Sequence, residues 1–258
     1  NDKHPEDDFA LVKQRYPSPE RFDCYAVGQV QPYMMHNVLG CDSLTTVDFD
    51  WRIQDVHFQL LQAYRADAIG DRTQLEETLA AIQVGWTAFV EEKSRTGNGS
   101  LRTFCSSAQL EECVSHLLDF QDNLASLRIF QLDLAGTHQI HWVETPPEVT
   151  RVLFLSNAME PIYTSAEDFD AFMRSLEGAL APGQKAVLIH HVGSYRHFGL
   201  YEAQLGDDGL ELQTVCRDPY NATMDDFTEP FYDTYMDDRS ITPAPVPHCH
   251  ALLETAEP

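Results

Sequence analysis

Residues 24–50 read CYAVGQVQPYMMHNVLGCDSLTTVDFD and show the pattern of a strand, a helix and a second strand. Residues 24–28 form a short apolar run that ends in Gly28, which predicts a buried strand followed by a turn. Residues 44–48 are rich in β-branched side chains and end in Asp48, so they predict a second buried strand. Residues 32–39 between them suit one short helix. Strands joined through a helix run parallel, so this stretch predicts the start of a parallel sheet.

The same alternation continues along the chain. We expect helices at residues 51–67, 74–90, 107–125, 166–180 and 200–205, and further strands at 127–133, 152–155, 186–190, 210–216 and 249–253. Strands that alternate with helices predict an α/β fold with a mostly parallel sheet covered on both faces. The helices within about 51–125 would form an insertion between the second and third strands. We expect an N-terminal arm at 1–21, a single domain at 22–258 and an aromatic-rich loop at 217–246.

The composition excludes several classes of protein. The chain has 17 basic and 41 acidic residues, and its formal net charge is -24. A nucleic-acid binder needs the opposite sign on its surface, so we expect no nucleic-acid partner. Hydrophobic residues make up 43% of the 258 residues, which excludes wholesale disorder. No stretch approaches the ~18 uninterrupted apolar residues of a membrane-spanning helix, so we expect no membrane span.

Polar residues gather at the predicted carboxyl ends of the strands, where open α/β sheets bind ligands. Asp48 lies 20 residues after Gly28, a spacing that suits a carboxylate accepting hydrogen bonds from the two hydroxyls of a ribose. Asp133, at the next strand end, is a candidate for an adenine amino group. Each has a plainer alternative: a tight turn for Gly28, a solvated loop acid for Asp133 and a helix cap for Asp48, although Asp50 is the better-placed cap.

Seven segments together resemble the class I S-adenosylmethionine-dependent methyltransferases, over about residues 22–256. In chain order they are CYAVGQ, LTTVDFD, LRIFQLDLAG, TRVLFLSNA, FDAFMRSLEGALAPGQKAVLIHH, GLELQTVCRDPY and CHALLE. The resemblance implies a Rossmann-like, seven-stranded, mostly parallel sheet that is closed by an antiparallel pair at 210–216 and 249–253. It also implies S-adenosylmethionine as the cofactor and a small molecule as the methyl acceptor.

The resemblance implies roles for individual residues as well. The cofactor would be bound by Gly28, Gln29, Asp48, Phe49, Asp133 and Ser156, and the acceptor would meet Asn157, Tyr163 and His190. The family's first motif is an acid followed by three alternating glycines, and this chain departs from it. Ala26 stands in place of the acid, Gly28 is the only glycine, and Val30 and Pro32 occupy the other two positions. Side chains there should narrow the site where the methionine part would lie.

The six cysteines predict three disulfides. In the predicted sheet, Cys24 and Cys41 lie at the same edge, Cys105 and Cys113 flank the start of one helix, and 216 and 249 lie at joined ends of an antiparallel pair. All three separations fit the Cα distances that a disulfide requires, so we expect the bridges Cys24–Cys41, Cys105–Cys113 and Cys216–Cys249. Disulfides favour an oxidising, extracytoplasmic compartment. The alternative is three pairs of free thiols in a cytoplasmic protein.

The eleven histidines do not predict a metal site. His190 and His191 are adjacent on a strand and point to opposite faces, and His248 and His250 would need a third ligand from elsewhere. A general base at His190 or His191 stays open.

Two functional hypotheses remain. The first is a methyltransferase-like protein that binds an S-adenosylmethionine-type ligand and transfers a methyl group. The second is a catalytically inactive, exported, disulfide-linked relative that serves as a binding or structural subunit, with the inserted helices as its interface. The missing glycines and the cysteines favour the second, and the acids at the strand ends favour the first.

Overall fold

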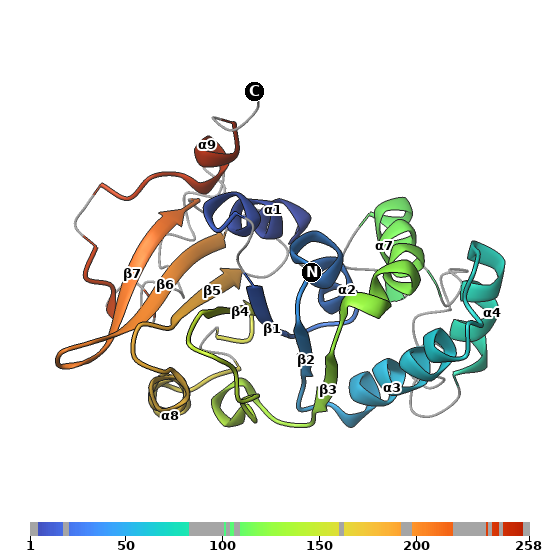
Figure 1. The fold of residues 1–258 in the computed structure, drawn as a ribbon, viewed down its shortest axis with the longest axis horizontal. Coiled ribbons are helices and arrows are strands. Elements are labelled where there is room, and N and C mark those ends of the chain that lie inside the picture. The colour runs from blue at the N-terminus through green and yellow to red at the C-terminus, as the bar shows by residue number, and fades with distance from the viewer. Residues whose placement is uncertain are drawn as a thin grey trace.

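A single sheet organises the chain. The computed structural model describes residues 5–17, 21–82, 101, 104–105, 109–159, 163–191, 198–218, 236, 239–242 and 245–254. Within these residues seven strands pair in the order β3-β2-β1-β4-β5-β6-β7 (Figure 1). Their bounds are β1 Arg21–Ala26, β2 Ser43–Val47, β3 Ile129–Asp133, β4 Val149–Ser156, β5 Lys185–His191, β6 Phe198–Gly206 and β7 Gly209–Arg217.

The predicted α/β class and the mostly parallel, seven-stranded sheet are confirmed. Strands β1 to β5 are mutually parallel where they pair, whereas β6 runs antiparallel to both β5 and β7. The strand order reverses at β1, which has β2 on one side and β4 on the other. Such a reversal is the point at which open α/β sheets leave a crevice at the carboxyl ends of their strands.

Two elements at the end of the chain differ from the prediction. Residues 200–205, expected to be helical, belong to β6, and residues 249–253, expected to be a strand, belong to the helix α9 (Cys249–Glu254). The antiparallel pair is therefore β6 with β7, joined by a tight turn in which Gly206 faces Gly209. Because β6 is paired on both sides, ladder hydrogen bonds and packing outweigh the helical preference of its side chains.

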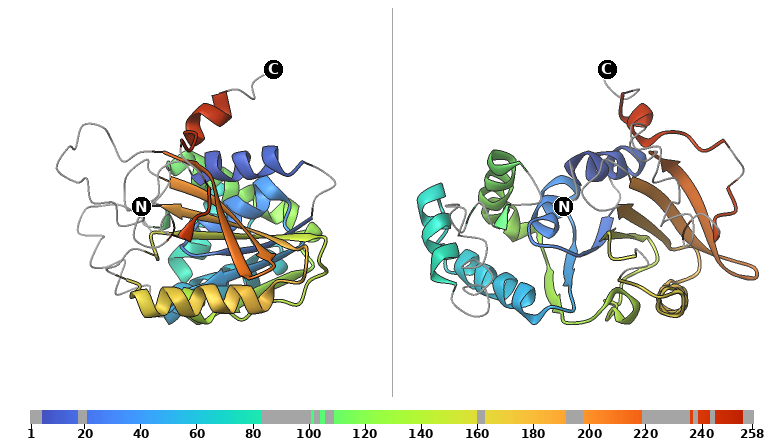
Figure 2. Two further views of the ribbon diagram at one scale, coloured as in Figure 1. Left: turned by 90° about the vertical axis from the view of Figure 1, so that its left-hand side faces the viewer. Right: turned by 180° about the vertical axis from the view of Figure 1, so that it is seen from behind.

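Helices cover both faces of the sheet. Helices α1 (Pro5–Arg15) and α2 (Gln31–Leu39) lie on one face and α8 (Ala166–Ala179) lies on the other (Figure 2). Successive side chains of a strand point to opposite faces of the sheet, so each strand buries side chains against both layers of helices. Phe154 of β4 packs in the core beneath α1 and α2, whereas its neighbour Leu153 packs beneath α8.

Helix α1, within the predicted N-terminal arm, is tied to the sheet by a buried polar contact. The Asp8 carboxylate accepts a hydrogen bond from the ring of His191 in β5, and both side chains are almost fully buried. The side chains of Phe9 and Val12 are also buried, so α1 is part of the core. The domain boundary at residue 21 stays a prediction. No helix of the described residues is both long and apolar enough to cross a membrane.

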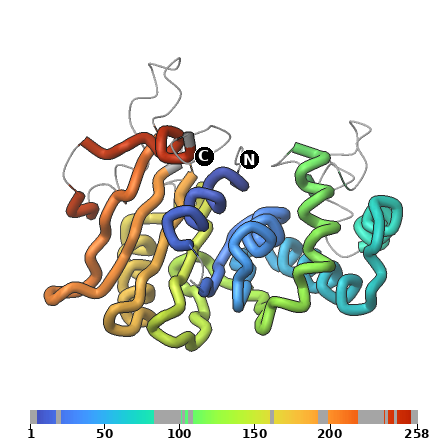
Figure 3. The backbone as a smooth tube through the Cα atoms, turned by 45° about the horizontal axis from the view of Figure 1, so that its top comes forward, coloured from blue at the N-terminus to red at the C-terminus, as the bar shows by residue number. Residues whose placement is uncertain are grey.

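The predicted helical insertion between the second and third strands is confirmed. Its described helices are α3 (Trp51–Arg65), α4 (Arg72–Ala81) and α7 (Leu110–Asn123), which lie together beyond the β3 edge of the sheet (Figure 3). Asp50 caps α3 by accepting a hydrogen bond from the backbone of Arg52, so the cap is Asp50 and Asp48 is left to the cavity described below. Two short 3₁₀ turns, η1 (Leu124–Ser126) and η2 (Thr137–Gln139), flank β3. Residues 83–90 of the predicted second helix and most of the aromatic loop lie outside the described residues.

The three predicted disulfides are all present. Cys24–Cys41, Cys105–Cys113 and Cys216–Cys249 have Cα–Cα distances of 5.9, 5.7 and 4.9 Å, and no cysteine is free. The third pairing is correct although Cys249 begins a helix instead of a strand. Cys216 still lies near the end of β7, and the chain returns to that end before α9 begins.

We expect the disulfides to contribute unequally to stability. In the chain-entropy model, removing Cys216–Cys249, with a separation of 33 residues, costs roughly 4 kcal/mol, and removing Cys105–Cys113, with a separation of 8, costs roughly 2.5 kcal/mol. Urea unfolding of the two paired cysteine-to-alanine variants measures the difference. A larger loss for the shorter loop would contradict the entropic origin.

Candidate functional site

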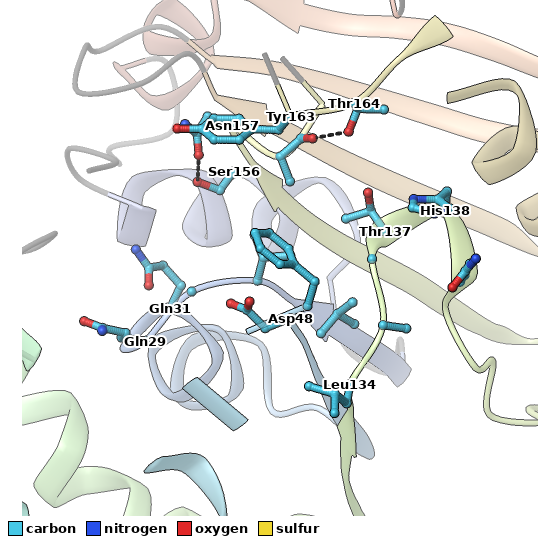
Figure 4. A pocket seen from close by; sticks show the side chains of 18 residues that line it. Gln29, Gln31, Asp48, Leu134, Thr137, His138, Ser156, Asn157, Tyr163 and Thr164 are labelled. Atoms are coloured by element: carbon cyan, nitrogen blue, oxygen red, sulfur yellow. Dashed lines mark hydrogen bonds between the residues drawn. The ribbon is translucent and has the colours of Figure 1, made fainter. Parts of the chain in front are cut away.

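A cavity of about 730 Å³ opens at the carboxyl ends of β1 to β4, where the strand order reverses. Figure 4 shows Ser156 and Asn157 on one side, Leu134 on the other and the Asp48 side chain between them. The lining residues follow the ends of four strands, so residues far apart in sequence meet here. They are Val27, Gly28, Gln29, Gln31, Val47, Asp48, Phe49, Leu134, Ala135, Gly136, Thr137, His138, Gln139, Ser156, Asn157, Ala158, Tyr163 and Thr164.

The turn after β1 requires a glycine. Gly28 has a φ of +102°, which L side chains rarely adopt, and a Cβ built there would lie 2.5 Å from Oε1 of Gln31. The side chain of Gln31 therefore packs directly against the turn. Helix α2 begins immediately afterwards, and its N-cap residue Val30 makes no side-chain cap. The amino end of α2, with its partial positive charge, thus lies at the cavity.

Asp48 is the carboxylate of this cavity. Its Oδ1 accepts a hydrogen bond of 2.8 Å from the backbone N–H of Asp50, which orients the side chain. Burial raises the pKa of the Asp48 carboxyl to about 6, because removal from water disfavours the charged form. Among the described residues no cation offsets this shift, and perturbed acids of this kind are typical of functional sites.

Exposed apolar side chains also line the cavity. Phe49 is 79% exposed, and Leu134 and Tyr163 are each 59% exposed, although large apolar side chains are usually buried. All three belong to the cavity wall. An apolar wall with a few polar groups is typical of a site for a small organic ligand.

The end of β4 has an irregular backbone. Ser156 has a φ of +50°, unusual for a residue other than glycine, and the pairing of β4 with β5 shifts register between Phe154 and Ser156. The Ser156 hydroxyl donates a hydrogen bond of 3.4 Å to Oδ1 of Asn157, and the Thr164 hydroxyl bonds the carbonyl of Ala158. Local strain of this kind concentrates at ligand sites, where it re-aims side chains.

The cavity brings together most of the residues proposed from sequence. Those that line it are Gly28, Gln29, Asp48, Phe49, Ser156, Asn157 and Tyr163. They come from the ends of β1, β2 and β4 and from the segment after β4. Their individual roles stay predictions.

Asp133 and His190 do not line the cavity. The Asp133 carboxylate accepts hydrogen bonds from the backbone N–H of His141 at 2.7 Å and from its ring Nδ1 at 2.6 Å. Asp133 therefore holds the segment that follows β3. His190 is buried within β5, where burial and the neighbouring His191 lower its pKa to about 3. Neither side chain belongs to the described lining of the cavity, although His190 pairs with Ser156, which does.

Residues 134–139 and Gln31 form part of the wall and were missing from the sequence prediction. They follow the carboxyl ends of β3 and β1, so the rule that selected Asp133 also applies to the residues just beyond it. A glycine shortly after a strand end, Gly136, was the signal in the sequence. In the structure a Cβ at this position would lie 2.8 Å from Cε1 of His138, so the segment turns tightly here.

The electrostatics of the wall limit what it can bind. Among the described residues, the lining includes one carboxylate, Asp48, and no lysine or arginine. Amide and hydroxyl groups supply most of its polar atoms. The described lining therefore offers hydrogen-bond partners to a ligand with hydroxyl groups.

No family profile matches the chain, and no curated protein matches it. Among solved structures, the glycopeptide N-methyltransferase MtfA with S-adenosylmethionine aligns with 12% identity and a TM-score of 0.36, over 83% of this chain and 66% of that one. The rRNA methyltransferase aviRa from Streptomyces viridochromogenes aligns with 13% identity and a TM-score of 0.33, over 69% and 70%. The CcbJ methyltransferase from Streptomyces caelestis aligns with 12% identity and a TM-score of 0.33, over 86% and 81%.

We expect Gly28→Ala to destabilise the protein by about 1–3 kcal/mol, because alanine at this φ is strained and its Cβ displaces Gln31. The matched control is Gly178→Ala in α8, where no atom lies within 4 Å of the new Cβ and alanine should stabilise the helix by up to ~1 kcal/mol. Chemical denaturation measures both. Equal effects at the two sites would contradict the strain argument.

Proposed function

We propose that the cavity binds an S-adenosylmethionine-type ligand and that the protein is methyltransferase-like. The observation that carries the proposal is Asp48, a partly buried carboxylate at the end of β2 that lies in one cavity with the Gly28 turn. A carboxylate accepts two hydrogen bonds well, and the vicinal hydroxyls of a ribose supply two donors. The other contacts of the proposal follow from this anchor.

The adenine ring would lie against the apolar wall near Phe49 and Leu134. The exposure of both side chains gives a planar base a surface that it would remove from water. Gln139 and Thr137 supply polar groups on the same side of the cavity. We assign Asp133 no contact with the ligand, because its carboxylate already accepts two hydrogen bonds from His141.

A dinucleotide is the competing ligand for a cavity at this place in an α/β sheet. A diphosphate is bound by basic side chains or by backbone N–H groups at a helix amino end, usually after a glycine-rich turn. The described part of the wall has neither lysine nor arginine, and the turn before the amino end of α2 carries one glycine, with Gln31 packed against it. A sulfonium compound carries no phosphate, so the electrostatics favour S-adenosylmethionine or S-adenosylhomocysteine over NAD.

The chain's own contribution to methyl transfer would be alignment. S-adenosylmethionine, when bound, supplies an electrophilic methyl group, so the protein needs no nucleophile of its own. Asn157 and Tyr163 are placed to orient a small acceptor, since both line the cavity on the side of the β4 end. Positioning of this kind supplies much of the rate of a group transfer between two bound partners.

The alternative is an inactive, exported relative of such an enzyme that acts as a binding or structural subunit. Three disulfides support an oxidising compartment. The single glycine of the turn and the burial of His190, which is not part of the described lining, support loss of catalysis. In this case the inserted helices would provide the interface with a partner protein.

Calorimetry with S-adenosylhomocysteine and S-adenosylmethionine tests the proposal. We expect Asp48→Asn to weaken binding by roughly 1.5–3 kcal/mol, the range for hydrogen bonds to a charged group. Asparagine keeps an oxygen for the N–H of Asp50, so the local structure should survive. The matched control is Asp119→Asn on the exposed face of α7, which should bind like the wild type. No heat from the wild type with either ligand at millimolar concentration would refute the enzyme and favour the inactive subunit.

The raised pKa of Asp48 predicts opposite effects of pH on binding and on folding. Binding requires the ionised carboxylate, so affinity should fall about tenfold between pH 7 and pH 5, through the pKa of about 6. The ligand-free fold favours the protonated form, so the contribution of Asp48 to stability should fall as pH rises from 4 to 6. Asp48→Asn should therefore stabilise the ligand-free protein at pH 7, on the order of 3 kcal/mol, and remove the pH dependence of binding. Calorimetry and urea unfolding at several pH values measure both. A stabilising variant with unchanged affinity would argue against a ligand role.

A further inference from the structure

We propose that helix α3 of the insertion fixes the ligand-binding turn through His57, so that a residue outside the cavity sets the affinity of the site. His57 is a positioning residue in this proposal. The effect of His57 on ligand affinity rests on the proposed function, whereas its effect on the conformation of the turn does not. The proposal stands on hydrogen bonds that join α3 to the ends of three strands.

His57 links the turn to α2. Its Nε2 lies 3.0 Å from the carbonyl oxygen of Gly28, and its Nδ1 lies 2.8 Å from the hydroxyl of Tyr33. A carbonyl only accepts hydrogen bonds, so Nε2 must carry the proton and Nδ1 must accept from Tyr33. The geometry therefore assigns one tautomer of His57, with both ring nitrogens in use.

The environment of His57 keeps the ring neutral. The side chain is 1% exposed, and burial lowers its pKa to about 4. Its ring packs against that of Tyr33, with centroids 5.5 Å apart. A neutral, doubly bonded ring in a dry environment is a rigid link, because loss of either bond would leave a buried polar group without a partner.

Gln54 extends the same attachment to β2 and β3. It lies three residues before His57 on the same face of α3 and is also buried. Its Nε2 donates to the carbonyl oxygens of Thr46 at 3.1 Å and Asp133 at 3.2 Å, and its Oε1 accepts from the Thr46 hydroxyl at 2.7 Å. One helix therefore holds the backbone at the ends of β1, β2 and β3, all of which lead into the cavity.

The bond to Gly28 determines where the next peptide group points. In a trans peptide the C=O and N–H groups point in opposite directions, so fixing the Gly28 oxygen also fixes the N–H of Gln29. Gly28 and Gln29 both line the cavity. A turn with a single glycine and a φ of +102° would otherwise sample several peptide orientations. His57 removes that freedom before a ligand binds, which lowers the entropic cost of binding.

Three variants separate positioning from stability. We expect His57→Phe, which keeps the ring and loses both hydrogen bonds, to weaken S-adenosylhomocysteine binding by about tenfold or more. His57→Gln, whose amide can donate to Gly28, should recover most of the affinity. The matched control is Tyr64→Phe on the same helix, which removes a buried hydrogen bond of 2.8 Å to the carbonyl of Leu117 and keeps the ring that packs near Tyr33. It should lower stability and leave affinity unchanged.

A readout without ligand tests the turn itself. In ¹⁵N NMR of the wild type, the His57 ring should show the Nε2–H tautomer, and the Gln29 amide should shift in His57→Phe and not in Tyr64→Phe. If His57→Phe does not fold, Tyr33→Phe and His57→Gln supply the same comparison. An Nδ1–H tautomer, an unmoved Gln29 amide, or unchanged affinity in a folded His57→Phe protein would overturn the proposal. A wild type that binds no nucleoside would refute the proposed function, and the NMR result would still decide the role of His57 in the turn.

Discussion

The position of β1 between β2 and β4 is the constraint from which the rest of the structure follows. Crossovers between parallel strands are right-handed, so a chain that moves from β1 to β2 and one that moves from β4 to β5 place their helices on opposite faces. Helix α2 therefore covers one face and α8 the other. The connections diverge at the carboxyl edge, and the space between them is the cavity. The fold creates this space, and the residues after each strand determine its chemistry.

Most of the sheet was predictable because its central strands are short, apolar and followed by turn residues. The last part was not, because residues 200–205 carry Glu202, Ala203 and Gln204, which favour helices in isolation. Pairing with β5 and β7 outweighed that preference. The sequence did hold a signal, since Asp207 and Asp208 precede Gly209 and form a two-residue hairpin turn. A local preference is a weak guide where a strand is paired on both sides.

The site was predictable to the extent that it depends on strand ends. Asp48 and Gly28 follow from spacing, whereas the use of Asp133 by His141 depends on how the segment after β3 turns back, which no local pattern indicates. His57 lies on the apolar face of α3, between Val56 and Leu60. A polar residue within such a face was a visible signal. The partner of His57 could not be predicted, because Gly28 lies 29 residues earlier and contacts His57 only in the folded protein.

The disulfides have a consequence for how the chain is made. Each cysteine pairs with the next cysteine in the sequence, so the three loops at 24–41, 105–113 and 216–249 neither overlap nor enclose one another. Six cysteines allow many pairings, and most of them require a thiol to wait for a partner that has yet to be synthesised. Here a chain that emerges amino terminus first can close each loop before the next pair appears. The order of synthesis therefore favours the native bridges over the other pairings.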